Sequence, residues 1–364
     1  MNEDSFSYLV DPAAIKAAVA KIPSGGPIAV DVEAAGLYRY RDEVCLIQIA
    51  SKGEVYLIDA LAQWADYSGL AEIFKDPYTA KVFHGCDYDI RLLKRQYGFA
   101  VTPVFDTMIA AQFLGKKAFG LAALLLEEFG IEADKKYQKA DWSARPLDAG
   151  MLAYAALDVI HLCELASRLE RELEKLGRLG WAKEEFRLLE LAEPSPPAPP
   201  CALDFKGAGK FTPRQSAVLQ ALLEVRDETA REWDRPPFKV LSGDLLLGWA
   251  QNPPKNKKEI FEAKGASPKV IAKLSDKILA SVNAALALPP EKCPRRESLE
   301  KLAPLTDAQK ARLAKLKEAR AKRAEALSMD PGFIINTATL EKIARAQNAP
   351  EFLDKILKNW QREA

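Results

Sequence analysis

Histidine and cysteine are scarce in this sequence, and their scarcity limits the chemistry that we expect of it. Only two of the 364 residues are histidines, His84 and His161, which nearly excludes a metal site built from imidazole ligands. The five cysteines are scattered and include no C-x-x-C pair. We therefore expect neither a disulfide framework nor a zinc site, and we expect a reducing, cytoplasmic environment.

Long apolar stretches are also missing. No apolar run reaches the length of a membrane span. The N-terminal residues MNEDSFSYLV lack the basic-then-apolar pattern of a signal peptide. With 48% hydrophobic and 28% charged residues, the composition is that of an ordinary globular protein, and the length predicts two or three domains.

Charge is divided unevenly along the chain. Residues 1–200 contain 22 basic and 30 acidic side chains, whereas residues 201–364 contain 30 basic and 21 acidic ones. A basic second half could attract a polyanion while an acidic first half holds cations. Ordinary variation between domains explains the same numbers, so both interpretations stay open at this point.

Two carboxylates interrupt a predicted buried strand near the N-terminus. The apolar run that begins at Ile28 leads directly into Asp31 and Glu33, and residues two apart in a strand point to the same side. Adjacent carboxylates repel each other and are costly to remove from water. A divalent metal with oxygen ligands would relieve both costs. The alternative is a solvated surface pair, because a D-x-E pair alone is weak evidence.

Two further carboxylates lie at suggestive positions. Asp89 is near the start of a predicted helix that follows a strand, where α/β sheets often place their sites, although it could simply favour the helix dipole. Asp158 lies in a predicted helix that is apolar nearly all round, one turn after Tyr154 on the same face. The alternative for this pair is a buried tyrosine hydrogen-bonded to a structural aspartate.

The order of the predicted elements in the first half indicates a mixed sheet flanked by helices. Strands are predicted from Ile28, at Val44–Ala50, at Glu54–Asp59 and at Ala80–Phe83. Helices are predicted at Pro12–Ala20, Tyr67–Phe74, Asp87–Tyr97, Val104–Leu114 and Gly120–Phe129, and a long helical region from about Leu147 to about Leu191.

The second half begins with a proline-rich linker and contains an internal repeat. The linker AEPSPPAPP covers residues 192–200 and should be extended. The segments RPPFKVLSGDL and DPGFIINTATL, at Arg235–Leu245 and Asp330–Leu340, align without a gap. In each, Ser242 or Thr337 is predicted to cap the next helix. Two copies indicate two small tandem helical domains.

The combination of Asp31, Glu33, Asp89, Tyr154 and Asp158 resembles the site of the DEDD superfamily of 3′-to-5′ exonucleases, and the Y-x-x-x-D spacing resembles its tyrosine branch. The surrounding segments AVDVEAAGL, KVFHGCDYDIRLL, FDTMIAAQFLG and KADWSARPL with YAALDVIHL resemble ribonuclease D. The resemblance implies an α/β, ribonuclease H-like exonuclease domain followed by two small all-α HRDC bundles. It implies an exonuclease domain at 1–191, a linker at 192–211, a first HRDC domain at 212–287, a linker at 288–299 and a second HRDC domain at 300–364.

The resemblance also implies a reaction. It is a metal-dependent 3′-to-5′ exoribonuclease reaction on structured RNA, such as trimming the 3′ trailers of tRNA precursors, with release of nucleoside 5′-monophosphates. Two Mg²⁺ or Mn²⁺ ions would be bound, with Asp31 bridging both, Glu33 and Asp158 completing one site, and Asp89 holding the other partly through water. Tyr154 would orient the attacking water. RNA is the expected partner, and neither a membrane nor an obligate protein partner is expected.

Four further residues are candidate substrate contacts. Leu37 follows the first motif, where related enzymes have an apolar wedge, but it could be a buried turn residue. His84 ends a strand and could be structural. Trp142 and Arg145 could contact the substrate backbone or could lock the loop ahead of the catalytic helix.

Two alternative functions stay open. The acidic motifs do not distinguish RNA from DNA, so a DNA exonuclease of the same superfamily is one. A non-catalytic RNA-binding scaffold is the other, although a scaffold would not need four acids together. The basic runs NPPKNKKEI and KARLAKLKEARAKRAEA fit phosphate contacts by the helical domains, or simply a solvated helix face.

Overall fold

A computed structural model of the chain describes residues 6–62, 66–196, 198–265, 267–296, 303–346 and 350–364. The chain forms two compact units. Unit 1 comprises Met1–Ala34, Glu43–Ser195 and Pro304–Ala364, and unit 2 comprises Ala35–Asp42 and Pro196–Ala303. The end of the predicted linker 288–299 and the start of the predicted module 300–364 lie outside the described residues.

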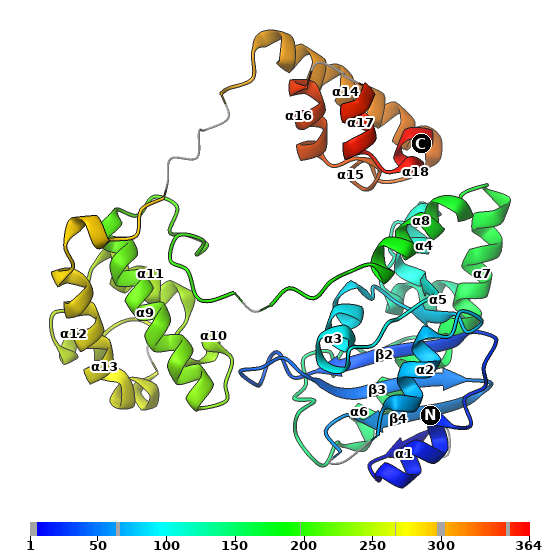
Figure 1. Cartoon of the computed structure of the whole chain (residues 1–364), viewed down its shortest axis with the longest axis horizontal. Helices are drawn as coiled ribbons and strands as arrows, with labels where there is room; N and C mark the ends of the chain where they lie inside the picture. Colours follow the sequence, from blue (N-terminus) through cyan, green and yellow to red (C-terminus); the bar gives the residue numbers. More distant parts are fainter. Residues whose placement is uncertain (1–5, 63–65, 197, 266, 297–302, 347–349) are drawn as a thin grey trace. The chain divides into compact units, whose positions relative to one another are not determined.

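A six-stranded sheet organises unit 1, in the order β1-β4-β3-β2-β5-β6. Its strands are β1 (Ser7–Leu9), β2 (Ile28–Ala34), β3 (Val44–Ser51), β4 (Glu54–Asp59), β5 (Lys81–Phe83) and β6 (Val104–Asp106). Strands β2, β3 and β4 form an antiparallel meander (Figure 1), while β1, β5 and β6 each pair in parallel with a neighbour. The predicted mixed sheet is confirmed.

The sheet differs from the prediction at its two edges. Strand β1 was not predicted, and the predicted helix Val104–Leu114 is wrong in its first three residues, which form β6. Three residues are too few to show the period of a strand beside a longer helical pattern. Asp106 ends β6 and begins the helix, because its side chain accepts the backbone N–H groups of Met108 and Ile109.

Eight helices among the described residues surround the sheet. They are α1 (Pro12–Val19), α2 (Ser68–Lys75), α3 (Asp87–Tyr97), α4 (Thr107–Phe113), α5 (Leu121–Phe129), α6 (Ala149–Ile160), α7 (Leu162–Lys175) and α8 (Leu179–Glu190). The long helical region predicted from about Leu147 to about Leu191 contains three helices, which are separated at His161 and near Gly177, whose φ of +66° suits glycine.

One stretch of unit 1 would pass as a membrane span by length and composition alone. An 18-residue window within Ala149–Lys175 has a mean hydropathy of 1.4. The chain breaks it at His161 into α6 and α7. Helix α6 packs on β2, β3 and β4, and α7 packs on β2 and β5, so the apolar residues of this stretch cover the sheet.

The C-terminal part of unit 1 is a group of helices that docks on α4 and α8. The helices are α14 (Asp307–Leu327), α15 (Pro331–Ile334), α16 (Thr337–Arg345), α17 (Pro350–Ile356) and α18 (Asn359–Glu363). Trp360 is the anchor, because it is 2% exposed, lies edge-on to Phe113 of α4 and donates from Nε1 to Glu185 of α8 at 2.6 Å. Glu184 also accepts the backbone N–H groups of Asn359 and Trp360 at the start of α18.

Unit 2 is a helical bundle with its own apolar core. Its helices are α9 (Pro213–Glu232), α10 (Pro237–Val240), α11 (Gly243–Gln251), α12 (Lys257–Phe261) and α13 (Pro268–Ala287), followed by a 3₁₀ turn at Pro290–Lys292. Ser242 caps α11 as predicted. In the second copy the predicted cap Thr337 is wrong, because Asn336, one residue earlier, accepts the N–H of Thr339.

Candidate active site

Strand β2 carries the first two acids of the site. Its residues Ile28, Ala29 and Val30 are buried, and Asp31 and Glu33 follow on one face of the strand. Because β2 lies inside the sheet, between β3 and β5, its polar residues cannot turn away to a sheet edge. Both acids are therefore held in a partly buried position.

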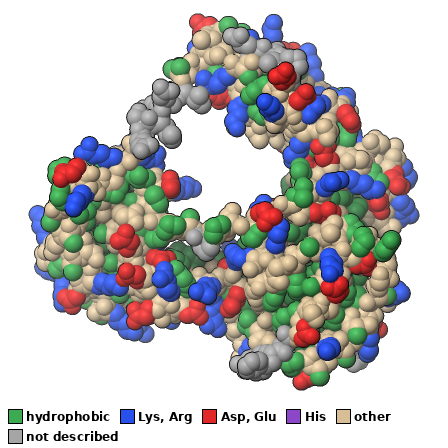
Figure 2. All heavy atoms as spheres, viewed as in Figure 1, with side chains coloured by type: hydrophobic (Ala, Val, Ile, Leu, Met, Phe, Trp, Pro, Cys, Tyr) green, Lys and Arg blue, Asp and Glu red, His purple; other side chains and the backbone are tan. Residues whose placement is uncertain are grey.

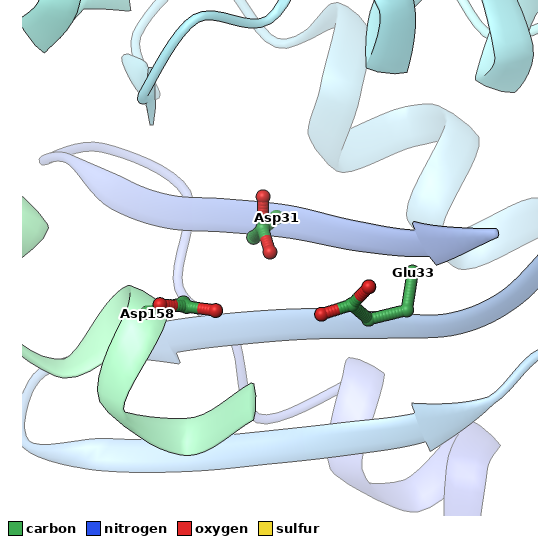
Figure 3. A group of neighbouring side chains, drawn as sticks. All are labelled: Asp31, Glu33 and Asp158. Carbon is green, nitrogen blue, oxygen red and sulfur yellow. The ribbon is translucent and has the colours of Figure 1, made fainter. Parts of the chain in front are cut away.

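Helix α6 brings the third acid to the same place. Asp148 caps this helix by accepting the N–H of Met151, and Tyr154 and Asp158 follow on one face. One carboxylate oxygen from each of Asp31, Glu33 and Asp158 lies within 4.8 Å of the other two. Figure 3 shows these carboxylates turned toward one another from β2 and α6.

Asp89 approaches the group from the first turn of α3. Burial raises its pKa well above the usual value, and the negative charge of Asp31 raises it further. The charge of Asp89 in turn contributes to the raised pKa of Glu33. The four acids proposed from the sequence therefore influence one another across three elements of the fold.

No protein cation neutralises this group within the described part of the chain, where none of the four acids forms an ion pair with lysine or arginine. Burial raises the pKa of Asp31 to about 7, and burial with repulsion from Asp31 raises those of Asp158 and Glu33 to about 8 and about 10. Clustered oxygen donors of this kind fit a hard divalent cation.

Tyr154 lies between two aromatic rings at the edge of the acids. Its ring centroid is 6.2 Å from that of Trp142 and 6.1 Å from that of Tyr137. Burial and the negative charges of Asp158, Glu33 and Asp31 raise the pKa of the phenol. Tyr154 therefore stays protonated at neutral pH and can donate a hydrogen bond.

Arg145 and Trp142 belong to the loop that precedes α6. The Arg145 guanidinium binds both carboxylate oxygens of Asp59, at 2.6 and 2.7 Å, and also donates to the carbonyls of Cys45, Trp142 and Ala144. Trp142 is 2% exposed. These contacts support the interpretation that the two side chains lock the loop.

The two other candidate contacts are His84 and Leu37. The Nδ1 atom of His84 lies 2.9 Å from the hydroxyl oxygen of Thr107, and this hydroxyl donates to the carbonyl of Phe83. The Thr107 hydroxyl has only this one proton to donate, so it accepts a hydrogen bond from Nδ1 of His84. Leu37 belongs to the segment Ala35–Asp42 of unit 2 and is 43% exposed.

Sequence reasoning missed one polar residue of the site. Gln48 of β3 is fully buried and donates from Nε2 to Asp31 Oδ2 at 3.3 Å. The signal was present in the sequence, because Gln48 is an amide inside the apolar run VCLIQIA. Only the strand register shows that it faces Asp31.

Comparisons with known proteins agree with this geometry. Sequence models of two families match the chain, described as 3′-5′ exonuclease over residues 7–174 and as HRDC domain over residues 215–282. The chain is 30% identical to ribonuclease D of Gluconacetobacter diazotrophicus, over 92% of this chain and 84% of that protein. It is also 30% identical to ribonuclease D of Pseudomonas paraeruginosa, over 92% and 89% of the two chains.

Solved structures show the same likeness. Escherichia coli RNase D, described as an exoribonuclease involved in structured RNA processing, superposes with a TM-score of 0.71 at 26% identity, covering 99% of this chain and 92% of that one. The catalytic core of RRP6 from Trypanosoma brucei gives a TM-score of 0.70 at 29% identity, with 79% and 82% covered. The exonuclease domain and one HRDC domain are thus shown.

Proposed function

The chain belongs to the ribonuclease D family of 3′-to-5′ exoribonucleases, and we propose that it trims structured RNA from the 3′ end with its four clustered acids. The observation that carries the proposal is the meeting of Asp31, Glu33 and Asp158 within 4.8 Å, with no ion pair to a lysine or arginine among the described residues. The trailers of tRNA precursors are the substrates that we propose.

The acids have the donor chemistry of a site for two divalent ions, Mg²⁺ or Mn²⁺. Asp31 lies at the centre, so it would touch both ions; Glu33 and Asp158 would complete one position and Asp89 the other. When bound, the ions supply the positive charge that activates water and stabilises the leaving oxygen. The raised pKa values of the acids mean that protons must leave the site as cations enter it.

Tyr154 would position the attacking water by donating or accepting a hydrogen bond, and its raised pKa argues against a role as the base. Water adds across the last phosphodiester bond. The bond between phosphorus and the O3′ atom of the shortened chain breaks, the proton passes to that O3′ atom, and a nucleoside 5′-monophosphate leaves.

The helical modules would bind the body of the RNA. We propose that residues 300–364 form a second HRDC domain. Helices α14, α15 and α16 are a long helix, a four-residue helix and a nine-residue helix, the same order as α9, α10 and α11. Helix α14 exposes Lys315 and Lys317, which suit phosphate contacts. Figure 2 shows basic side chains interspersed with acidic ones on the visible face.

The cell compartment and further partners belong to the same proposal. All five cysteines are free thiols, which suits a reducing cytoplasm. RNA is the only partner that the proposed reaction requires.

The test uses a 3′-tailed, tRNA-like RNA and its DNA counterpart, both end-labelled, with Mg²⁺, Mn²⁺ or chelator. Asp89→Asn is compared with Asp87→Asn, since Asp87 lies in the same turn of α3 but is exposed and pairs with Arg91. We expect a metal-dependent ladder on RNA, slowed roughly 10²-fold or more by Asp89→Asn and unchanged by Asp87→Asn.

Each other outcome has a defined meaning. Undiminished turnover in Asp89→Asn would reject the proposed metal site. Equal degradation of DNA would indicate a DNA exonuclease, and RNA binding without cleavage under every metal condition would indicate a scaffold.

A further inference from the structure

Gln48 faces the central acid of the site from the neighbouring strand. The antiparallel register of β2 and β3 pairs Asp31 directly with Gln48, so the two side chains lie on the same face of the sheet. The side-chain amide donates from Nε2 to Asp31 Oδ2 at 3.3 Å, at the long end of the hydrogen-bond range.

The fold gains little from an amide at this position. Every residue of β3 is buried, and Gln48 itself is fully buried. Its Oε1 atom is buried and has no hydrogen-bond partner among the described residues. A buried amide oxygen without a donor is costly, whereas an apolar side chain of similar size would pack here without that cost. The amide therefore serves something other than the stability of the strand.

The Gln48 side chain is uncharged, and this also suits a position beside Asp31. An amide supplies a hydrogen bond to Asp31 without adding a charge. A lysine or arginine would compete with a metal ion for the carboxylate, and a glutamate would add a further negative charge to acids that already repel one another. A neutral donor that holds one oxygen of Asp31 leaves the other oxygen and the charge of the group available.

We propose that Gln48 is a positioning residue that orients Asp31 for metal binding and, through Asp31, for hydrolysis. This inference rests on the proposed function of the same site. Hydrogen bonds to a metal-binding side chain fix its orientation, and their removal typically weakens metal affinity or activity by about 10–100-fold. Gln48 acts in this way without touching the substrate.

The experiment replaces Gln48 with methionine, which has nearly the same shape and no hydrogen-bonding amide. Ser51→Ala, in the same buried strand, is the matched control. Three quantities are measured on the full-length chain: the thermal midpoint in chelator, the affinity for Mn²⁺ by calorimetry without RNA, and kcat and KM on the tailed RNA. Asp31→Ala is measured in parallel.

We expect Gln48→Met to keep or raise the thermal midpoint while it weakens Mn²⁺ binding and lowers kcat roughly 10-fold, with KM for RNA little changed. Excess Mn²⁺ should restore part of kcat.

Two outcomes would overturn the inference. One is normal Mn²⁺ affinity and normal kcat in Gln48→Met while Asp31→Ala is inactive. The other is a lower thermal midpoint with normal kcat per folded molecule, which would make Gln48 a structural residue. If Asp31→Ala itself retained turnover, the proposed function would fail first, and the two failures are thereby distinguished.

Discussion

Asp31 and Asp59 are aspartates on the same face of one sheet, yet their surroundings are opposite in charge. The register places Glu33, Leu46 and Asp59 in one row across β2, β3 and β4, and Asp31 shares the face of Glu33. Both carboxylate oxygens of Asp59 accept hydrogen bonds from Arg145, and Oδ2 also accepts one from the Tyr8 hydroxyl at 2.7 Å. No corresponding protein cation reaches Asp31 within the described residues.

The protonation behaviour of the two acids follows from this difference. Burial acts to raise the pKa of Asp59, but the hydrogen bonds from Arg145 and Tyr8 outweigh it and lower the pKa. Burial raises the pKa of Asp31 to about 7. The same sheet thus neutralises one buried carboxylate with its own arginine and leaves a neighbouring group uncompensated. An uncompensated group of acids is stable only if protons or outside cations supply the missing charge.

Two substitutions test the difference between Asp59 and the acids around Asp31: one removes the arginine that pairs with Asp59, and the other removes the charge of Asp31. Arg145→Met leaves Asp59 without its cation and should lower the free energy of unfolding by about 2–3 kcal/mol, less than for a fully buried pair because the Arg145 side chain is 26% exposed. Asp31→Asn relieves repulsion and should raise the stability of the metal-free protein by about 1 kcal/mol. Calorimetric unfolding in chelator measures both.

The control for the arginine is Arg171→Met, on the exposed side of α7, which should change stability by less than about 0.5 kcal/mol. Added Mn²⁺ should raise the midpoint of Arg145→Met and fail to raise that of Asp31→Asn. A loss of stability in Asp31→Asn equal to that in Arg145→Met would show that the two acids have the same structural role.

The two kinds of acid also differ in how far the sequence could predict them. Asp31, Glu33 and Asp158 interrupt apolar patterns, and a charged residue in such a pattern is visible without a structure. In the structure one strand and one helix bring the three together. The partners of Asp59 could not be predicted, because Arg145 is 86 residues away and Tyr8 is 51 residues away in the chain.

Other residues show the same limit. Gln48 was visible as a polar residue, but only the register shows which acid it faces. The strands β1 and β6 have three residues each and are defined by their pairing with β4 and β5 rather than by a local pattern. Local pattern thus predicted the positions of the acids, and long-range pairing decided which of them received a protein partner.

The pH dependence of stability sharpens the comparison. The acids around Asp31 have pKa values raised to about 7 for Asp31 and about 8 for Asp158, so the folded metal-free protein keeps protons that the unfolded chain releases above pH 4–5. Its stability should therefore fall as the pH rises from 5 to 8. Asp59 has a lowered pKa, and its contribution is fully present over this range and is lost only in stronger acid.

Thermal midpoints measured in chelator from pH 5 to pH 8 give the slope of stability against pH. The slope should be smaller in Asp31→Asn and should be opposed by Mn²⁺, whose binding strengthens as the protons leave. A midpoint that rises with pH in the metal-free wild type would contradict the raised pKa values.

The smallest expected effect concerns the second partner of Asp59. Tyr8→Phe removes one hydroxyl that donates to Asp59 Oδ2 but leaves the ion pair with Arg145 intact, so stability should fall by about 1 kcal/mol. Tyr78→Phe is the control, because Tyr78 is 79% exposed. Since the lost hydrogen bond favours the charged carboxylate, the loss should shrink in strong acid, where Asp59 is protonated. A loss that instead stayed constant down to that pH would mean that the Tyr8 hydroxyl stabilises β1 independently of the charge of Asp59 and that Arg145 alone compensates Asp59.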